Sequence, residues 1–326
     1  MMSQGHALFC WLTAFCLVAV GVTNLAAQND ATGAKPRRFV AVTFDDLPAQ
    51  RGNLAKMQQI TGKVIKSIVK HKIPAVGFVN EGKLYTQKGE VDARIALLRE
   101  WTNAGLELGN HTYSHINNQT AALSAYQDDI VRGETVTRQL LQEKGLKLRY
   151  FRHPFLFTGL TNDYKQGIEQ FLAARDYTVA PVTIDNSDYI YAYTYGAAQK
   201  RGDTATMKRV ADGYVPHMET MCDYFEKVSR ESLGYEVKQI LLVHANEINA
   251  EYFDDMVAML KRRGYEFITL EEALKDPAYR LPEAQMKWGL SWLHRWMLAK
   301  GQKMRTDEPD VPKDIMDLYQ AAQRQQ

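Results

Sequence analysis

The sequence is poor in cysteine and has almost no excess of either charge. It contains three cysteines in 326 residues, and two of them, Cys10 and Cys16, lie in an apolar segment near the N-terminus. The remaining Cys222 cannot form an intramolecular disulfide alone, so the fold must depend on a hydrophobic core. The 40 basic and 38 acidic residues give a formal net charge of +2, which argues against nucleic acid as a partner.

Long apolar runs are also scarce. Residues 7–22 form one, and no charged residue occurs before Asp30. With the small residues that follow it, this run predicts a secretory signal peptide over residues 1–27, cleaved near Ala27. Its ~16 residues are fewer than the ~20 that a spanning helix needs, so we expect no stable membrane insertion after cleavage. The sequence thus predicts an exported protein, periplasmic or extracellular, and leaves its oligomeric state open.

The first predicted strand ends in two adjacent carboxylates. Residues 40–44 are nearly all apolar, as in a parallel strand covered on both faces, and Asp45 and Asp46 follow at its carboxyl end. Open α/β sheets and barrels bind their ligands at this end. Successive side chains on a strand point in opposite directions, so the two carboxylates suit different roles, such as base and metal ligand. The alternative is a solvated strand end with a turn at Leu47-Pro48.

Apolar strands and amphipathic helices alternate along the rest of the chain. Further strands are predicted at residues 74–79, 106–109, 148–151, 178–184, 239–244 and 267–270. Helices are predicted around residues 54–69, 95–101, 123–141, 164–174 and 254–263. This alternation predicts one parallel sheet covered by helices, and the length left after the signal suits a single α/β barrel.

Histidines follow the third predicted strand. If residues 110–115 turn helically, His111 and His115 are one turn apart and face the same way, so that they could share one metal ion. Two histidines at this spacing are more often exposed side chains on a helix surface that bind no ligand. The position of this pair after a strand, like that of Asp46, favours a site, because parallel strands bring their ends to the same rim.

Three further strands also end in polar side chains. Arg152 follows the fourth strand, and Pro154 stops the strand ladder just beyond it. Beside Asp45, this arginine would keep the carboxylate ionised. Asp185 and Asp188 follow the strand at residues 178–184, and His244 ends the strand at residues 239–244.

In order along the chain, these motifs resemble those of a known family. They are Thr43-Phe44-Asp45-Asp46, His111-x-x-x-His115, Arg152-x-Pro154-Phe155, Asp185-x-x-Asp188 and Leu242-Val243-His244. Over residues 38–270 the chain resembles the NodB-type polysaccharide deacetylases, also called carbohydrate esterase family 4. The resemblance implies an α/β fold, a distorted (β/α) barrel of about seven parallel strands. It also implies a hydrolase of non-peptide carbon-nitrogen bonds that removes acetyl groups from an N-acetylated glycan such as chitin or peptidoglycan.

The resemblance further implies a metal site and a base. Asp46, His111 and His115 would bind a divalent metal ion, with zinc as the expected ion and other divalent ions left open. Asp45 would be the general base, oriented by Arg152.

The resemblance also implies a general acid and contacts to the substrate. His244 would protonate the leaving amine, with Asp188 as its partner and Asp185 as the alternative. A backbone amide near Phe155 would hold the oxyanion. Tyr189 stands where the family commonly has Trp and would keep an aromatic wall.

Other parts of the chain lie outside the motifs. Leu47 occupies the position of the family's usual Gly, which favours another path for that loop. The barrel would span residues 38–275, with a helical insertion at residues 195–238 that could roof the site. Two helices are expected in this insertion, at residues 197–210 and 216–233.

A C-terminal helical extension and polar tail would cover residues 276–326. A helix is expected to start near Pro282, with Trp288, Trp292 and Trp296 on one stripe. Packing against the barrel is the more ordinary use of such a stripe, and stacking on sugar rings is the alternative. The tail from residue 300 is polar enough to fray.

Two other functions compete with a deacetylase. The barrel could serve as a non-catalytic glycan-binding protein, or hydrolyse another non-peptide carbon-nitrogen bond. Every expected catalytic position is filled, which favours the enzyme.

Overall fold

Seven parallel strands form the centre of the protein in the computed structural model, which describes residues 37–325. The predicted signal peptide lies outside the described residues. The strands are β1 (Arg38–Leu47), β2 (Val76–Val79), β3 (Glu107–Asn110), β4 (Tyr150–Phe151), β5 (Thr178–Val179), β6 (Gln239–His244) and β7 (Tyr265–Phe267). No helix within residues 37–325 is long and apolar enough to cross a membrane.

The sheet curls into a distorted barrel. Its strand order is β5-β4-β3-β2-β1-β6, and β7 pairs with the start of β1. Beyond β5, Ile184 forms a parallel bridge with Leu241 of β6, so the far edge of the sheet returns to its beginning. The prediction of a distorted (β/α) barrel with about seven parallel strands is confirmed.

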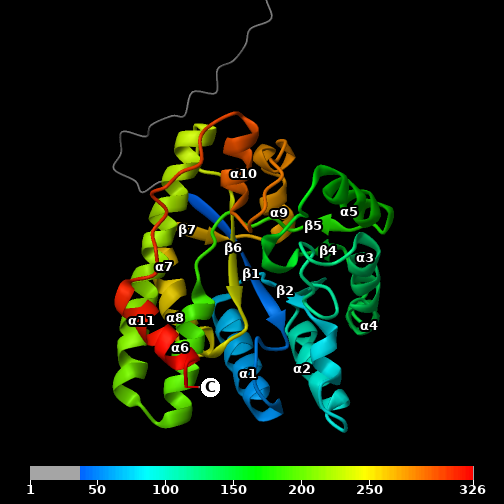
Figure 1. The fold of residues 1–326 in the computed structure, drawn as a ribbon. Helices are drawn as coiled ribbons and strands as arrows, with labels where there is room; N and C mark the ends of the chain where they lie inside the picture. The colour runs from blue at the N-terminus through cyan, green and yellow to red at the C-terminus, as the bar shows by residue number, and fades with distance from the viewer. Residues whose placement is uncertain (1–36, 326) are drawn as a thin grey trace, which may run out of the picture. The chain divides into compact units, whose positions relative to one another are not determined.

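Helices cover the outside of the sheet (Figure 1). The long helices are α1 (Leu54–His71), α2 (Val91–Asn103), α3 (Leu123–Arg132), α4 (Thr135–Gln142), α5 (Asn162–Ala174), α6 (Asp188–Arg201), α7 (Thr204–Leu233), α8 (Glu247–Arg262), α10 (Trp292–Ala299) and α11 (Lys313–Gln323). The short ones are α9 (Leu270–Leu274) and the 3-10 turns η1 (Glu81–Tyr85), η2 (Pro154–Leu156) and η3 (Pro277–Arg280).

Alternation along β1 decides which carboxylate faces the inside of the barrel. Val40, Val42 and Phe44 belong to the large core under the helices, where the Phe44 ring packs edge-on against Trp101 and Phe253. Ala41 belongs to the smaller core enclosed by the strands. Asp45 is four residues beyond Ala41, and alternate residues of a strand point to the same face. Its side chain therefore lies on the inner face, at the carboxyl end of the barrel.

The expected long helix over residues 123–141 is in fact two helices, α3 and α4, separated at Gly133. A Cβ at this glycine would lie 2.7 Å from the backbone of Thr112 and Tyr113. The absence of a side chain at Gly133 therefore lets the loop that carries His111 and His115 pack directly on the junction of the two helices.

The insertion also differs from expectation. Its second helix, α7, begins at Thr204 and continues through Pro216, so the predicted start at residue 216 is wrong. The helix packs against α6, α8 and α10, and this tertiary packing overrides the local preference of proline for a helix start.

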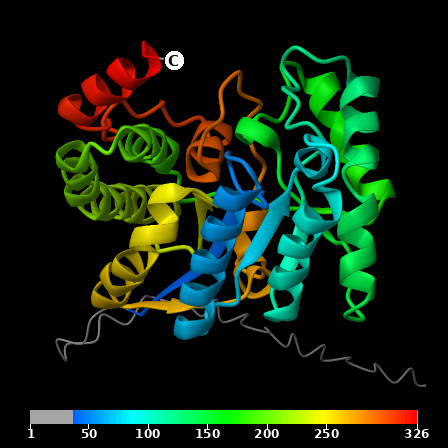
Figure 2. The ribbon, with the colours of Figure 1, turned by 90° about the horizontal axis from the view of Figure 1, so that it is seen from below.

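In the C-terminal extension, residues 282–291 are not helical, so the predicted helix start near Pro282 is wrong. Helix α10 begins instead at Trp292, after the Ser291 cap. The tail does not fray throughout: α11 buries Ile315 and Ala322 and packs against α6 (Figure 2).

Candidate metal centre and active site

Both carboxylates lie inside β1, which bends where they occur. The pairing of β1 with β2 shifts register between Phe44 and Leu47, and Asp46 has a left-handed backbone with φ of 72°. Such an irregularity re-aims side chains at a strand end. Asp45 and Asp46 are both buried, which excludes the alternative of a solvated strand end.

Asp46, His111 and His115 come together at this end of the barrel. One potential ligand atom from each residue lies within 4.8 Å of the other two. The helical turn expected for residues 110–115 is wrong: the segment is a loop in which Thr112 and His115 have φ of 63° and 56°. The two imidazoles therefore meet because of left-handed turns, with ring centroids 4.9 Å apart.

A hydrogen bond to the backbone fixes the orientation of the His111 ring. Its Nδ1 atom lies 2.8 Å from the carbonyl oxygen of Arg152, to which it donates a hydrogen bond as the Nδ1–H tautomer. Nε2 is then left with its lone pair, as in histidines that ligate metals. Burial holds the pKa of His111 well below its ordinary value and also lowers the pKa of His115, so both rings are neutral at pH 7.

A lysine that the motifs did not indicate lies against Asp46. The Nζ atom of Lys83, from η1, is 3.1 Å from Oδ1 of Asp46 and donates to the carbonyl oxygens of Asp46 and Ala49. Burial alone would raise the pKa of Asp46, but Lys83 and the neighbouring His115 hold that pKa well below its ordinary range. Asp46 is therefore ionised. The set of one carboxylate and two neutral imidazoles fits a divalent cation such as zinc.

Asp45 lies beside the buried guanidinium of Arg152. Nη1 of Arg152 is 3.4 Å from each carboxylate oxygen, while Nη2 donates to Oγ1 of Thr43 and Nε donates to the carbonyl of Ala180. These bonds attach Arg152 to both sides of the barrel. Burial raises the pKa of Asp45 to about 6, because the loss of hydration outweighs the attraction of Arg152.

His244 pairs with Asp188, and the alternative partner is not used. Nδ1 of His244 lies 2.6 Å from Oδ1 of Asp188, whereas Asp185 accepts a hydrogen bond from the backbone amide of Asn186. Burial would lower the pKa of His244, but Asp188 outweighs it and raises that pKa to about 9.

Two asparagines that the motif search missed donate hydrogen bonds to Asp188 of this pair. The side-chain amides of Asn246 and Asn249 donate to Oδ2 of Asp188 at 3.1 and 2.7 Å. Both follow His244 within one short stretch, so a search for buried amides near the last motif could have found them.

These groups face one hollow of 410 Å³. It is lined by Asp45, Asp46, Gln50, His111, His115, Phe155, Leu156, Asp185, Tyr189, Leu242 and His244. Phe155 and Leu156 both have φ of 55°, and the Phe155 ring packs edge-on against His115, with centroids 4.4 Å apart. The insertion at residues 195–238 contributes none of these lining residues.

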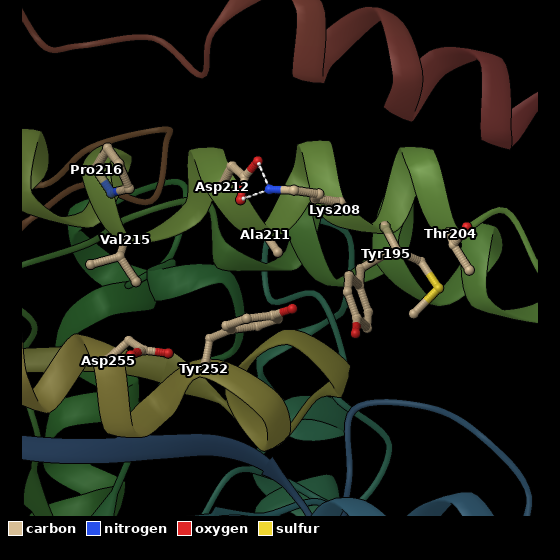
Figure 3. A pocket seen from close by; sticks show the side chains of 10 residues that line it. Tyr195, Thr204, Lys208, Ala211, Asp212, Val215, Pro216, Tyr252 and Asp255 are labelled. Atoms are coloured by element: carbon tan, nitrogen blue, oxygen red, sulfur yellow. Dashed lines mark hydrogen bonds and ion pairs between the residues drawn. The ribbon is translucent and has the colours of Figure 1, made fainter.

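A second hollow, of 560 Å³, lies between α7 and α8 (Figure 3). Tyr252 and Val215 line it, and Lys208 and Asp212 form an exposed ion pair at its edge. It contains none of the predicted site residues. We therefore assign the chemistry to the hollow at the barrel end, where buried titratable groups converge.

Comparisons with known proteins agree with this fold. Residues 32–180 match the family model for polysaccharide deacetylases. No curated protein matches. Among solved structures, the chitin deacetylase of the fungal pathogen Colletotrichum lindemuthianum is 19% identical, covers 76% of this chain and 92% of its own, and has a TM-score of 0.50.

Two bacterial structures are also similar. Peptidoglycan deacetylase PdaC from Bacillus subtilis is 19% identical, with coverage of 73% of this chain and 92% of its own and a TM-score of 0.44. A family 4 carbohydrate esterase pseudoenzyme from Bacillus anthracis is 16% identical, with coverage of 74% and 66% and a TM-score of 0.46. The resemblance indicated by the motifs is confirmed by the family-model match over residues 32–180 and by the fold shared with the chitin deacetylase.

Proposed function

We propose that this protein is a metal-dependent deacetylase that hydrolyses the acetamido group of N-acetylated sugars in a polysaccharide and releases acetate. One observation carries the proposal. A three-residue metal site, a buried carboxylate beside an arginine, and a histidine-aspartate pair face the same 410 Å³ hollow. Amide hydrolysis needs these three functions within reach of one carbonyl group.

Asp46, His111 and His115 would hold the ion. Zinc fits the donor set best, since three protein ligands of this kind leave a position open for catalysis. A divalent ion bound there supplies Lewis-acid polarisation and makes water more acidic at neutral pH.

Asp45 is the proposed base. Its inward position and its pKa of about 6 leave it ionised at pH 7, so it can accept a proton from the attacking water. Arg152 is fully buried and forms an ion pair with this carboxylate, which it would hold in place. Phe155 lines the hollow, and its backbone amide is the proposed donor to the oxyanion.

His244 is the proposed acid. Asp188 raises the pKa of His244 to about 9. The imidazole is therefore protonated at neutral pH, and its proton is available for the leaving amine. Tyr189 and Phe155 are both partly exposed at the hollow and offer aromatic walls for the sugar.

Export is part of the proposal. A signal peptide over residues 1–27 would deliver the enzyme to the periplasm or the exterior, where such polymers occur. The uncharged apolar segment at residues 7–22 supports it. Barrel limits of residues 38–275 and an extension over residues 276–326 are likewise proposed.

The test is acetate release from N-acetylglucosamine oligomers and from peptidoglycan, with and without a chelator. We expect release that stops on chelation and returns with zinc. Binding of these glycans without acetate release, in metal-loaded protein, would instead identify a non-catalytic glycan-binding protein.

A further inference from the structure

One tryptophan outside the proposed active site is exposed. The side chains of Trp101, Trp292 and Trp296 are at most 3% exposed, whereas Trp288 is 64% exposed. The prediction that the tryptophan stripe packs on the barrel therefore holds for Trp292 and Trp296 and fails for Trp288. An indole left mostly in water is a sizeable apolar surface that is open to a ligand.

The backbone that carries Trp288 is fixed to the Phe155 loop. Nη2 of Arg295, a fully buried residue of α10, donates to the carbonyl oxygens of both Leu156 and Trp288, at 2.8 and 3.3 Å. A Cβ at Gly289 would lie only 1.9 Å from the carbonyl oxygen of Phe155, so the two backbones touch. Trp288 thus stands directly beside a wall of the hollow.

A second attachment comes from the histidine loop. The side-chain amide of Gln119 donates to the carbonyl oxygen of Lys287, and Asn118 donates to the carbonyl of Phe157 at 2.5 Å. Residues 287–289 are therefore tied both to the loop that follows His115 and to the loop that carries Phe155. An exposed side chain on a segment held this firmly is preorganised to bind a ligand.

We propose that Trp288 is a stacking platform for a sugar ring of the same glycan chain, next to the ring that is deacetylated. The inference rests on the proposed function and adds that the substrate is a polymer bound across several rings. Phe155 is 48% exposed and lines the hollow, and the backbone at Gly289, next to Trp288, touches the Phe155 carbonyl, so a second exposed aromatic residue follows directly beside this wall. The faces of pyranose rings carry C–H groups, which pack on an indole while the hydroxyl groups stay in water.

Intrinsic fluorescence tests this platform directly, because Trp288 is the exposed tryptophan of the region that the structure describes. Zinc-loaded Asp45→Asn protein is titrated with N-acetylglucosamine oligomers of increasing length. We expect the emission to change on binding of longer oligomers and the change to disappear in Asp45→Asn/Trp288→Phe, which should still bind them by calorimetry. Binding without any change in emission would overturn the proposal.

Steady-state kinetics test the Trp288 platform independently. In the Trp288→Ala variant we expect KM for long oligomers to rise about tenfold, the equivalent of one stacking contact, with metal content unaltered. Trp288→Phe should restore most of the loss. Leu146→Ala is the matched control, since Leu146 is also exposed but precedes β4 at the opposite end of the barrel.

The two proposals fail in different ways. If wild-type protein releases acetate and Trp288→Ala has an unchanged KM at every oligomer length, the platform is wrong and the deacetylase stands. If wild type binds oligomers with a Trp288-dependent emission change but releases no acetate, the platform stands and the deacetylase is wrong. If Trp288→Ala abolishes only self-association in sedimentation, the indole serves a protein contact and the platform is wrong.

Discussion

Nδ1 of His244 lies 2.6 Å from Oδ1 of Asp188, and two asparagine amides donate to the other oxygen of the same carboxylate. The carboxylate is thus saturated with donors and fixed in position. The amide donors help keep Asp188 ionised, and the charge and hydrogen bond of Asp188 raise the pKa of His244 to about 9.

The pH dependence of activity follows from this pair and from Asp45. The proposed acid works only when protonated, so kcat/KM should fall as pH rises through about 9, the pKa of His244. The proposed base works only when ionised, so kcat/KM should also fall as pH drops through about 6, the pKa of Asp45. Acetate release measured from pH 5 to 10 should give a bell-shaped profile.

Asp188→Asn removes the charge that raises the pKa of His244. Burial then dominates and lowers that pKa, so the basic limb should move by at least one pH unit toward neutrality. Asp185→Asn is the control, because Asp185 does not bond to His244, and should move the limb much less. Equal shifts in the two variants would show that Asp188 has no special role.

Lys83 gives a prediction for metal affinity. Its ammonium group lies 3.1 Å from the Asp46 oxygen and repels any cation bound there. We expect Lys83→Met to bind zinc at least tenfold more tightly in a competition titration. Lys63→Met, which removes a more exposed pair with Glu251, should leave the affinity unchanged. Weaker binding in Lys83→Met would mean that the lysine chiefly holds the Asp46 loop in shape.

Arg295 gives a prediction for stability. Its guanidinium is fully buried and donates to Thr158 and to the carbonyls of Leu156 and Trp288. Arg295→Met leaves these acceptors unpaired and should lower the free energy of unfolding in urea by about 3 kcal/mol. Arg209→Met breaks an exposed pair with Asp314 and should cost less than about 1 kcal/mol. A similar decrease in the free energy of unfolding for both variants would contradict a stabilising role of the buried Arg295 hydrogen bonds.

The motif residues could be found from the sequence because each ends a strand or follows one. Strand ends of a parallel barrel meet at one rim, so Asp46, His111 and His244 were expected to lie near one another once the alternation of strands and helices indicated a parallel barrel. The means by which the histidines meet could not be found in this way. Left-handed backbone at Thr112 and His115 is set by tertiary contacts, such as the packing of this loop on Gly133.

Contacts between distant segments account for the other surprises. Lys83 lies in a 3-10 turn with no recognisable motif, and its approach to Asp46 depends on how η1 packs over the barrel end. The exposure of Trp288 depends in the same way on where α10 begins. A spacing of four residues suggested one stripe, but the non-helical backbone before Ser291 separates Trp288 from Trp292.

The division of labour between the two adjacent carboxylates is tested most directly by measuring zinc affinity and kcat together in Asp45→Asn and Asp46→Asn. We expect Asp45→Asn to keep zinc and lose ~10²- to 10⁴-fold in kcat, since an amide cannot accept the proton. Asp46→Asn should lose zinc affinity and recover some activity in excess metal. Loss of zinc from Asp45→Asn with retention by Asp46→Asn, or wild-type kcat in both, would contradict the proposed mechanism.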